Sequence, residues 1–455
     1  MTRKFKTVDY EAALELTITI GACLPPDHLA RFVVEIVKQL DLSCIYSQYG
    51  ERGGEAYDPR VLLGLLFYGY ATGVFSSRRI EEKTYSSIPF YFIAGGLHPD
   101  HDTINSFRQD FLDDLKELFV QILLIAQAAG VLELGNISLD GSKIHADASK
   151  SKAVSYKRLL ELDRQLQAEV EELFTLSQQS DPAQWPDGLD IATEIAFRQQ
   201  RRANLSQAKA VLEARAAARY QAELADYEAK QQERAAKAER TGRQPGGRPP
   251  QPPTPGVGDK EQYNFTDPDS PIMKNSTNGG FDQHYNVQAA VEQRSLLIVA
   301  NTLSAHPNDK QEAVPTLDAI PPVLGKPGAG ALDNGYFSAH NITEFQARGV
   351  DPYIATGREP HHRCWQDYFK EQTVPPAETA SPKEKMAYKL QTDIGKAIYG
   401  LRKCTVEPVI GIIKEILGFR QFSLRGLLKA AGEWNLVCIG FNLKRLHTLL
   451  AAKVS

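Results

Sequence analysis

The sequence predicts an α/β protein with a mixed sheet and flanking helices, an all-helical N-terminal domain, and a helical insertion between the first two strands. Three observations support this prediction. Residues 1–135 repeat apolar side chains with a helical period, residues 159–240 form two long amphipathic stretches, and the other segments alternate strand-like apolar runs with short helical patterns. A chain of 455 residues is also too long for one ordinary core.

Changes in composition give the expected domain boundaries. The helical N-terminal domain comprises residues 1–135, and the α/β domain comprises residues 136–150 and 264–455. Between these two parts, residues 151–263 form a helical-hairpin insertion that ends in a Pro/Gly-rich linker. The first strand is therefore separated from the rest of its sheet by a long insertion.

The N-terminal domain consists of short helices with recognisable start signals. Asp58 and Pro59 precede residues 60–73, which are apolar nearly all round and are expected to form the buried helix of the domain. Ser76 and Asp102 are candidate caps of two further helices. Arginines on compact, capped helices suit a helix-turn-helix-like unit that binds DNA, although composition alone favours an ordinary domain with solvated arginines. The candidate contacts are Arg78, Arg79 and Arg108.

The insertion has a different character. Residues 159–173 carry a short leucine stripe between charges, and residues 180–188 break the pattern with prolines and a glycine. An Ala-rich helix with mixed charge is expected from about residue 190 to 240, which makes a helical hairpin. The Pro/Gly segment 242–258 is compatible with neither helix nor strand.

The second part of the α/β domain alternates strands and helices. Its first two strands are separated by a three-residue gap and should form an antiparallel hairpin. In chain order we expect strands at 285–292 and 296–304, a proline-disturbed helix at 309–324, a strand at 328–333, a helix at 340–349 and a strand at 351–358.

Three carboxylates lie in unusual apolar settings. Asp140 lies within the first strand before Gly141, Asp333 ends a buried strand, and Glu407 follows an apolar helical run. Each alone is more often structural, because Asp-Gly is a frequent turn signal and an acid in the first turn of a helix is stabilised by the helix dipole. If the two strands are neighbours, however, the three acids could together hold divalent metal ions through hard oxygen ligands.

Positive charge is concentrated near the third acid. From Lys396 to the C-terminus there are ten basic and three acidic residues, a net charge of +7 in a chain whose overall net charge is −4. Nucleic acid is the natural partner for such a distribution. The basic and aromatic residues that accompany Glu407 are Tyr399, Arg402, Lys403 and Lys414.

Other features exclude alternative classes. The five scattered cysteines show no disulfide framework and fit a reducing compartment. The sequence shows neither a signal peptide nor a membrane-spanning apolar run. We therefore expect a cytoplasmic protein without a membrane partner. A zinc site at His361, His362 and Cys364 is disfavoured because adjacent histidines lack ligand spacing.

Together these motifs resemble the DDE transposases of bacterial insertion sequences, which have an RNase H-like catalytic domain. The segment 57–82 followed by 99–108 is similar to their helical N-terminal domain. The segments SLDGSKIHADAS, ALDNGYFS and YGLRKCTVEPVIGIIK resemble their first-Asp, second-Asp and Glu blocks. Related transposases carry the pattern Tyr-x2-Arg-x3-Glu-x6-Lys. Glu407 and Lys414 are separated by six residues, as in this pattern. The residue at the position of the pattern's Arg, with three residues between it and Glu407, is Lys403 and not Arg402.

The resemblance implies a mechanism. Asp140, Asp333 and Glu407 would be the catalytic acids and would hold two Mg²⁺ ions, for which Mn²⁺ could substitute. The enzyme would cleave at the ends of an insertion sequence and join the freed 3′-OH to target DNA. Lys414, Lys403, Arg402 and Tyr399 would position terminal DNA, and the N-terminal domain would bind the terminal inverted repeats. The resemblance also implies a homodimer on paired DNA ends and association with the nucleoid when bound.

Two alternatives remain open from the sequence. One is a metal-dependent DNA nuclease that hydrolyses DNA without strand transfer. The other is a catalytically inactive or domesticated transposase-derived protein that only binds DNA.

Overall fold

The structure is a computed structural model and describes residues 19–50, 56–179, 190–243, 246–274, 279–357 and 375–454. The chain divides into two compact units, of which the first contains Met1–Ala146 with His284–Ser455 and the second contains Asp147–Gln283. The N-terminal helices and the main sheet therefore share one unit, while the second unit extends the expected insertion at both ends.

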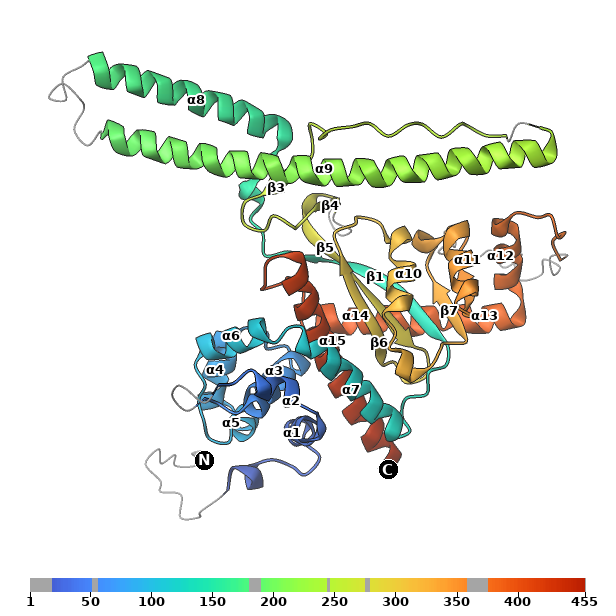
Figure 1. The fold of residues 1–455 in the computed structure, drawn as a ribbon. Coiled ribbons are helices and arrows are strands. Elements are labelled where there is room, and N and C mark those ends of the chain that lie inside the picture. Colours follow the sequence, from blue (N-terminus) through green and yellow to red (C-terminus); the bar gives the residue numbers. More distant parts are fainter. Residues whose placement is uncertain are drawn as a thin grey trace, which may run out of the picture. The chain divides into compact units, whose positions relative to one another are not determined.

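The N-terminal part of the first unit is helical, as expected (Figure 1). Asp58 caps α3 by accepting a hydrogen bond from the backbone N–H of Arg60 at 2.8 Å, and Pro59 occupies the first turn. The residues of α3 from Leu62 to Ala71 are buried, which confirms the expected central helix. The helices are α1 (Leu29–Gln39), α2 (Ser43–Ser47), α3 (Pro59–Ala71), α4 (Ser77–Ser86), α5 (Ile88–Ile93), α6 (His101–Asp110) and α7 (Asp114–Ala128).

The C-terminal helix α15 (Leu427–Val454) joins these helices to the sheet. It packs against α3 and α7 on one side and against strand β6 (Ile298–Ser304) on the other (Figure 1). Its middle turns are buried almost without interruption from Trp434 to Leu443. The core of the first unit therefore depends on a segment that lies more than 350 residues after α3 in the chain.

The sheet of the first unit is mixed. Its strand order is β6, β5 (Phe281–Glu292), β1 (Ile137–His145), β7 (Ala329–Leu332) and β8 (Asp351–Ile354). The pairs β6–β5 and β5–β1 are antiparallel, whereas β1–β7 and β7–β8 are parallel. The expected hairpin of β5 and β6 is confirmed, and this mixed α/β arrangement is consistent with an RNase H-like DDE domain.

Short helices connect and cover the strands. The prolines of the segment after β6 divide it into the short helices η4 (Asp309–Gln311), α10 (Ala313–Asp318) and η5 (Pro322–Leu324). The remaining helices are η6 (Asn334–Tyr336), α11 (Ala339–Ala347), α12 (Pro382–Gln391), α13 (Asp393–Gly400), α14 (Arg402–Gly411) and the π-helical turn η8 (Ile412–Ile416).

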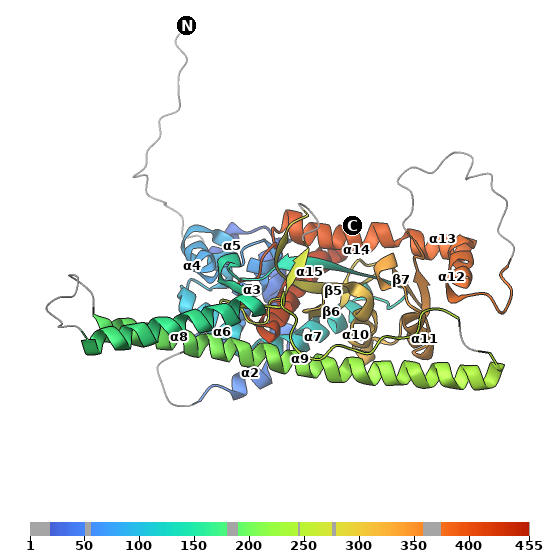
Figure 2. The same cartoon turned by 90° about the horizontal axis from the view of Figure 1, so that it is seen from above.

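The second unit is dominated by a helical hairpin. Helices α8 (Tyr156–Gln179) and α9 (Ile191–Thr241) lie side by side in both views (Figures 1 and 2) and share a small core of leucines and alanines. The expected break at 180–188 lies outside the described residues. The described residues of 242–258 form no helix or strand, as expected. Three short strands complete the unit: β2 (Ala153–Ser155) pairs with β3 (Gln262–Asn264), and β4 (Ile272–Lys274) pairs with residues 281–283.

Candidate active site

Asp140 lies within β1, and Asp333 directly follows the neighbouring strand β7. Strands β1 and β7 pair in parallel, and the last pair in their register is Leu139 with Leu332. Asp140 and Asp333 are the next residues along the two chains. Because the strands run in the same direction, the two acids lie at the same end of the stretch over which β1 and β7 pair.

Helix α14 carries Glu407 and is anchored to β1 by a buried hydrogen bond. Thr405 Oγ1 donates to Ser138 Oγ at 2.7 Å, and both residues are almost fully buried. Ser138, Asp140 and Ser142 alternate along the strand and share the face that α14 covers. The beginning of α14 is thereby placed over Asp140. Pro408 lies inside α14 and not at its start, so Glu407 is not a first-turn acid of this helix.

The three acids meet at one guanidinium group, that of Arg402. Arg402 Nη1 lies 3.2 Å from Asp140 Oδ2, and Nη2 lies 2.8 Å from Glu407 Oε1 and 3.7 Å from Asp333 Oδ1. The Arg402 side chain is only 6% exposed, whereas those of Asp333 and Glu407 are about half exposed at 50% and 47%. The cluster is therefore closed on the arginine side and open to solvent on the side of two acids.

Burial dominates the electrostatics of Asp140. It raises the pKa of this carboxyl to about 6, and the nearby Asp333 and Asp309 act in the same direction, while the Arg402 guanidinium opposes the shift. Burial likewise raises the pKa of the Tyr336 hydroxyl well above its usual value, and the surrounding carboxylates add to this effect. The site therefore concentrates negative charge in a partly dehydrated environment.

The donor chemistry of this cluster suits a hard divalent cation, because such ions prefer carboxylate oxygens. The geometry does not present a ready cage, however. Among the described residues no group of three or more His, Cys, Asp or Glu side chains is arranged to hold a metal ion. The point on which the three carboxylates converge is the guanidinium of Arg402.

Lys414 also contacts the face of β1 that carries Asp140. Its Nζ donates to Ser142 Oγ at 3.1 Å, two residues beyond Asp140 on β1. It belongs to the π-helical turn η8, a local irregularity of the kind that is frequent at functional sites. Lys414 is thus held close to the strand position of Asp140.

A pocket of ≈ 500 Å³ is lined by Tyr399 and Lys403 together with Lys396 and Thr356. The ring centroid of Tyr399 is 5.7 Å from the guanidinium carbon of Arg402, a cation–π distance. Tyr399 therefore connects this basic pocket with the carboxylate cluster.

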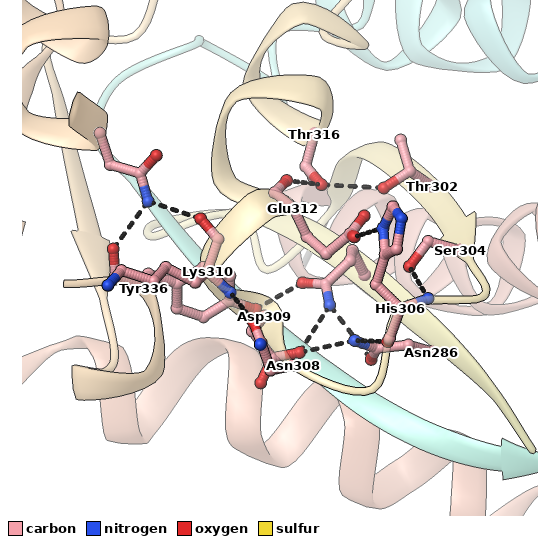
Figure 3. Close-up of polar contacts among 12 residues, drawn as sticks. Asn286, Thr302, Ser304, His306, Asn308, Asp309, Lys310, Glu312, Thr316 and Tyr336 are labelled. Carbon is pink, nitrogen blue, oxygen red and sulfur yellow. Dashed lines mark hydrogen bonds and ion pairs between the residues drawn. The ribbon is translucent and has the colours of Figure 1, made fainter. Parts of the chain in front are cut away.

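A polar network on β5 supports the site from the opposite face of β1 (Figure 3). Asp309 Oδ1 accepts hydrogen bonds from Asn286 Nδ2 at 2.8 Å and from Gln288 Nε2 at 3.0 Å. Tyr336, in the turn that follows Asp333, donates its hydroxyl proton to Gln288 Oε1. This network ties the end of β7 to strand β5.

Gly141 makes room for this network. Gln288 is its cross-strand partner, and a Cβ atom built at Gly141 would lie only 2.3 Å from Gln288 Nε2. A Cβ atom at Gly335 would meet nothing closer than Asp309 Oδ2 at 3.5 Å, an ordinary contact. Gly141 therefore admits the side chain of Gln288.

The three N-terminal arginines differ in their environments. Arg78 and Arg79 are exposed on α4 and are available to a partner. Arg108 is only 5% exposed and donates to Tyr70 Oη at 3.0 Å and Ser423 Oγ at 3.2 Å. The expectation that Arg108 contacts DNA is thereby corrected, because its guanidinium is used inside the protein, 3.8 Å from the buried carboxylate of Glu433.

Sequence reasoning missed the supporting residues of the site. Asn286 and Gln288 are buried polar residues that alternate with apolar ones in the middle of β5. Buried amides need hydrogen-bond partners, so their alternation within that strand was a usable signal of a polar network. Nothing in the sequence indicated that Arg402 would lie among all three acids. The cluster of His361, His362 and Cys364 lies outside the described residues.

A helical domain joined to a mixed sheet, with three acids around one guanidinium group, defines a candidate DDE-type enzyme. Two family models match the chain: one described as Transposase DDE domain matches residues 361–447, and one described as Transposase domain (DUF772) matches residues 19–110. No curated protein and no solved structure matches. The matches confirm the resemblance drawn from the motifs and support an insertion-sequence DDE transposase, an enzyme that acts on DNA.

The DDE match includes Arg402, Glu407 and Lys414, whereas Asp140 and Asp333 lie outside both matched segments. The N-terminal match extends from the short helix η1 (Ile20–Cys23) through α6. Within the described part of the chain, no helix has the length and apolar character needed to cross a membrane.

Proposed function

We propose that this chain cleaves DNA at the ends of an insertion sequence and transfers the freed 3′-OH into target DNA. The observation that carries the proposal is the convergence of Asp140, Asp333 and Glu407 on one guanidinium group from two parallel strands and a helix. Three acids brought together from distant parts of the chain, with two of them half exposed, are what a DNA phosphodiester and its metal ions require.

The acids are the catalytic residues in this proposal. Asp140, Asp333 and Glu407 would hold two Mg²⁺ ions, or Mn²⁺ in their place, and these ions would supply stabilisation of the charge that develops on the phosphodiester oxygens. Asp140 is short and fixed to a central strand, so it sets the position of the reaction relative to the sheet. Glu407 has a longer side chain and reaches the same point from α14.

The chemistry consists of two successive displacements at phosphorus. In the first, a water oxygen attacks the phosphodiester at the element end, the bond from phosphorus to the 3′ oxygen breaks, and that oxygen leaves as the 3′-OH. In the second, this 3′-OH attacks a target phosphodiester, and the target strand's own 3′ oxygen leaves. Each step makes one P–O bond and breaks one, so no oxidant or energy-rich co-substrate is needed.

The DNA-binding residues are proposed from charge and exposure. Phosphates of the terminal DNA are held by Lys414, whose ammonium group contacts Ser142 of β1. They are also held by Lys403 and Tyr399, which line the ≈ 500 Å³ pocket. Arg78 and Arg79 on α4 contact the terminal inverted repeats. We also propose that the protein acts as a homodimer on two paired ends, in the cytoplasm and on the nucleoid.

Cleavage of a duplex that contains the inverted repeats flanking the gene tests the proposal. The full chain with Mg²⁺ should nick at the repeat end, and Asp333→Ala should abolish nicking while retaining binding in a mobility-shift assay. The matched control is Glu133→Gln, which removes an 87% exposed carboxylate from the same unit and should leave nicking unchanged. Undiminished nicking by Asp333→Ala would refute the site assignment.

A second substrate separates the alternatives. A duplex with a pre-cut 3′-OH end should be joined to plasmid DNA by the wild-type chain. Nicking without joining would identify a nuclease, and binding without either reaction would identify a transposase-derived DNA-binding protein.

A further inference from the structure

We infer that Arg402 is a built-in counter-ion, which holds the three carboxylates together in the metal-free protein and is displaced from them when a divalent cation binds. This inference rests on the proposed function, because it concerns the same acids. It assigns Arg402 a role different from a direct DNA contact. Arg402 is a positioning residue here, since it acts on the acids.

The guanidinium of Arg402 reaches all three acids. One guanidinium lies 2.8–3.7 Å from an oxygen of each of the three acids. A guanidinium is planar and carries several N–H donors in a fixed fork, which lets it contact more than one carboxylate at a time. The acids are therefore prearranged around a positive group, although no metal-holding cluster is present among the described residues.

The charges of the three acids and of Arg402 do not cancel. Three ionised carboxylates carry three negative charges and Arg402 supplies one positive charge, so the arginine neutralises them only in part. A divalent cation compensates more of this charge and accepts the same oxygens as ligands. Metal and guanidinium therefore compete for the same oxygens of Asp140, Asp333 and Glu407.

The hydrogen bonding of Arg402 is incomplete. Arg402 is nearly buried, and its Nε has no hydrogen-bond partner among the described residues. An unpaired buried donor is unfavourable, so part of the stabilisation from the ion pairs is offset. Asp333 and Glu407 remain half exposed, which leaves a solvent route by which a cation can reach the acids.

The neighbouring basic residues provide the contrast. Lys403 is the next residue on α14 but is exposed and lines the pocket with Tyr399. Removal of Lys403 deletes the same charge from the same turn without removing a group from the acid cluster. It is therefore the matched control for Arg402.

Direct metal binding by the full chain tests the inference. After treatment with EDTA, Mn²⁺ is titrated and the free ion is measured by electron paramagnetic resonance, together with the thermal unfolding temperature. A unit charge within a few ångströms changes the affinity of a site for a proton by about one to three powers of ten. We therefore expect Arg402→Ala to bind Mn²⁺ at least about tenfold more tightly than the wild type, and Lys403→Ala to change binding less than about twofold.

Thermal unfolding gives an independent readout. Without metal, Arg402→Ala should unfold at a lower temperature because the three acids repel each other, and Mn²⁺ should raise its unfolding temperature more than that of the wild type. Arg402→Gln retains much of the side-chain volume and serves as the second variant if the alanine variant does not fold. Equal or weaker Mn²⁺ binding by the folded Arg402 variant would overturn the inference.

The failure of the inference is distinguishable from failure of the proposed function. If the wild type binds Mn²⁺ and Asp333→Ala abolishes that binding, the acid site stands whatever the Arg402 variants do. If the wild type binds no Mn²⁺ and the Arg402 variants bind none either, both the metal site and the counter-ion role are wrong.

Discussion

Arg108→Ala should destabilise the protein strongly, because Arg108 is the positive member of a buried network between the N-terminal helices and α15. Its guanidinium donates to Tyr70 and Ser423 and lies 3.8 Å from Glu433, which is fully buried. The hydroxyl and the backbone N–H of Ser423 also donate hydrogen bonds to the Glu433 carboxylate. The network therefore links three segments that are distant in sequence.

The expected loss follows from the burial of Glu433. The Glu433 side chain is 0% exposed. Removal of Arg108 would leave this buried carboxylate without its nearby positive charge. Removal of one partner of a buried ion pair typically costs 3–5 kcal/mol, so a loss of about 3–5 kcal/mol is expected in the free energy of unfolding. Exposed substitutions typically change it by no more than about 0.5 kcal/mol, which is the expectation for the matched controls Arg78→Ala and Arg79→Ala.

Urea unfolding followed by far-ultraviolet circular dichroism measures these differences, and a mobility-shift assay on the inverted repeats completes the comparison. Arg78→Ala and Arg79→Ala should weaken DNA binding without a change in stability. The double variant Arg108→Met with Glu433→Gln should recover part of the stability, because it also removes the buried negative charge. A loss below about 1 kcal/mol for Arg108→Ala would refute this account of the network.

Two further predictions concern the surroundings of the acids. Gly141→Ala should displace Gln288, because the added Cβ would lie 2.3 Å from its amide nitrogen, and it should lower the free energy of unfolding by about 1–3 kcal/mol in urea titrations. Gly335→Ala, whose Cβ meets no atom closer than 3.5 Å, should be tolerated, and equal losses for the two would contradict this reasoning. Lys414→Ala should weaken binding to terminal DNA and reduce the slope of log K against log salt by about 0.9, the value for one phosphate contact. Lys116→Ala, a 61% exposed control, should leave the slope unchanged, and an unchanged slope for Lys414→Ala would exclude a phosphate contact.

Local patterns in the sequence determined the elements of the fold. Alternation and apolar runs predicted β5, β6, β7 and β8, and the antiparallel hairpin was predicted from the short gap between the first two of these. The long helices of the insertion were predicted as well, because periodicity over many residues is a strong signal. These features depend on neighbours in the chain, so they can be inferred without a tertiary structure.

The candidate acids were also identifiable from sequence, because each is an acid in an apolar setting. Asp140 and Asp333 were expected to lie together only if their strands were neighbours. The parallel pairing of β1 with β7 meets this condition. Strand order depends on contacts between segments almost two hundred residues apart, and local patterns carry no information about it. The tertiary structure decided this point.

Burial of charged side chains was decided only by the tertiary structure. Arg78, Arg108 and Arg402 are the same residue type on helices, yet the first is exposed, the second binds Glu433 inside the core, and the third lies among three carboxylates. An arginine's role depends on which acids the fold brings to within a few ångströms of it. The sequence by itself therefore determined the elements, the acids and the family resemblance, whereas the fold decided which positive charges face solvent and which are held inside.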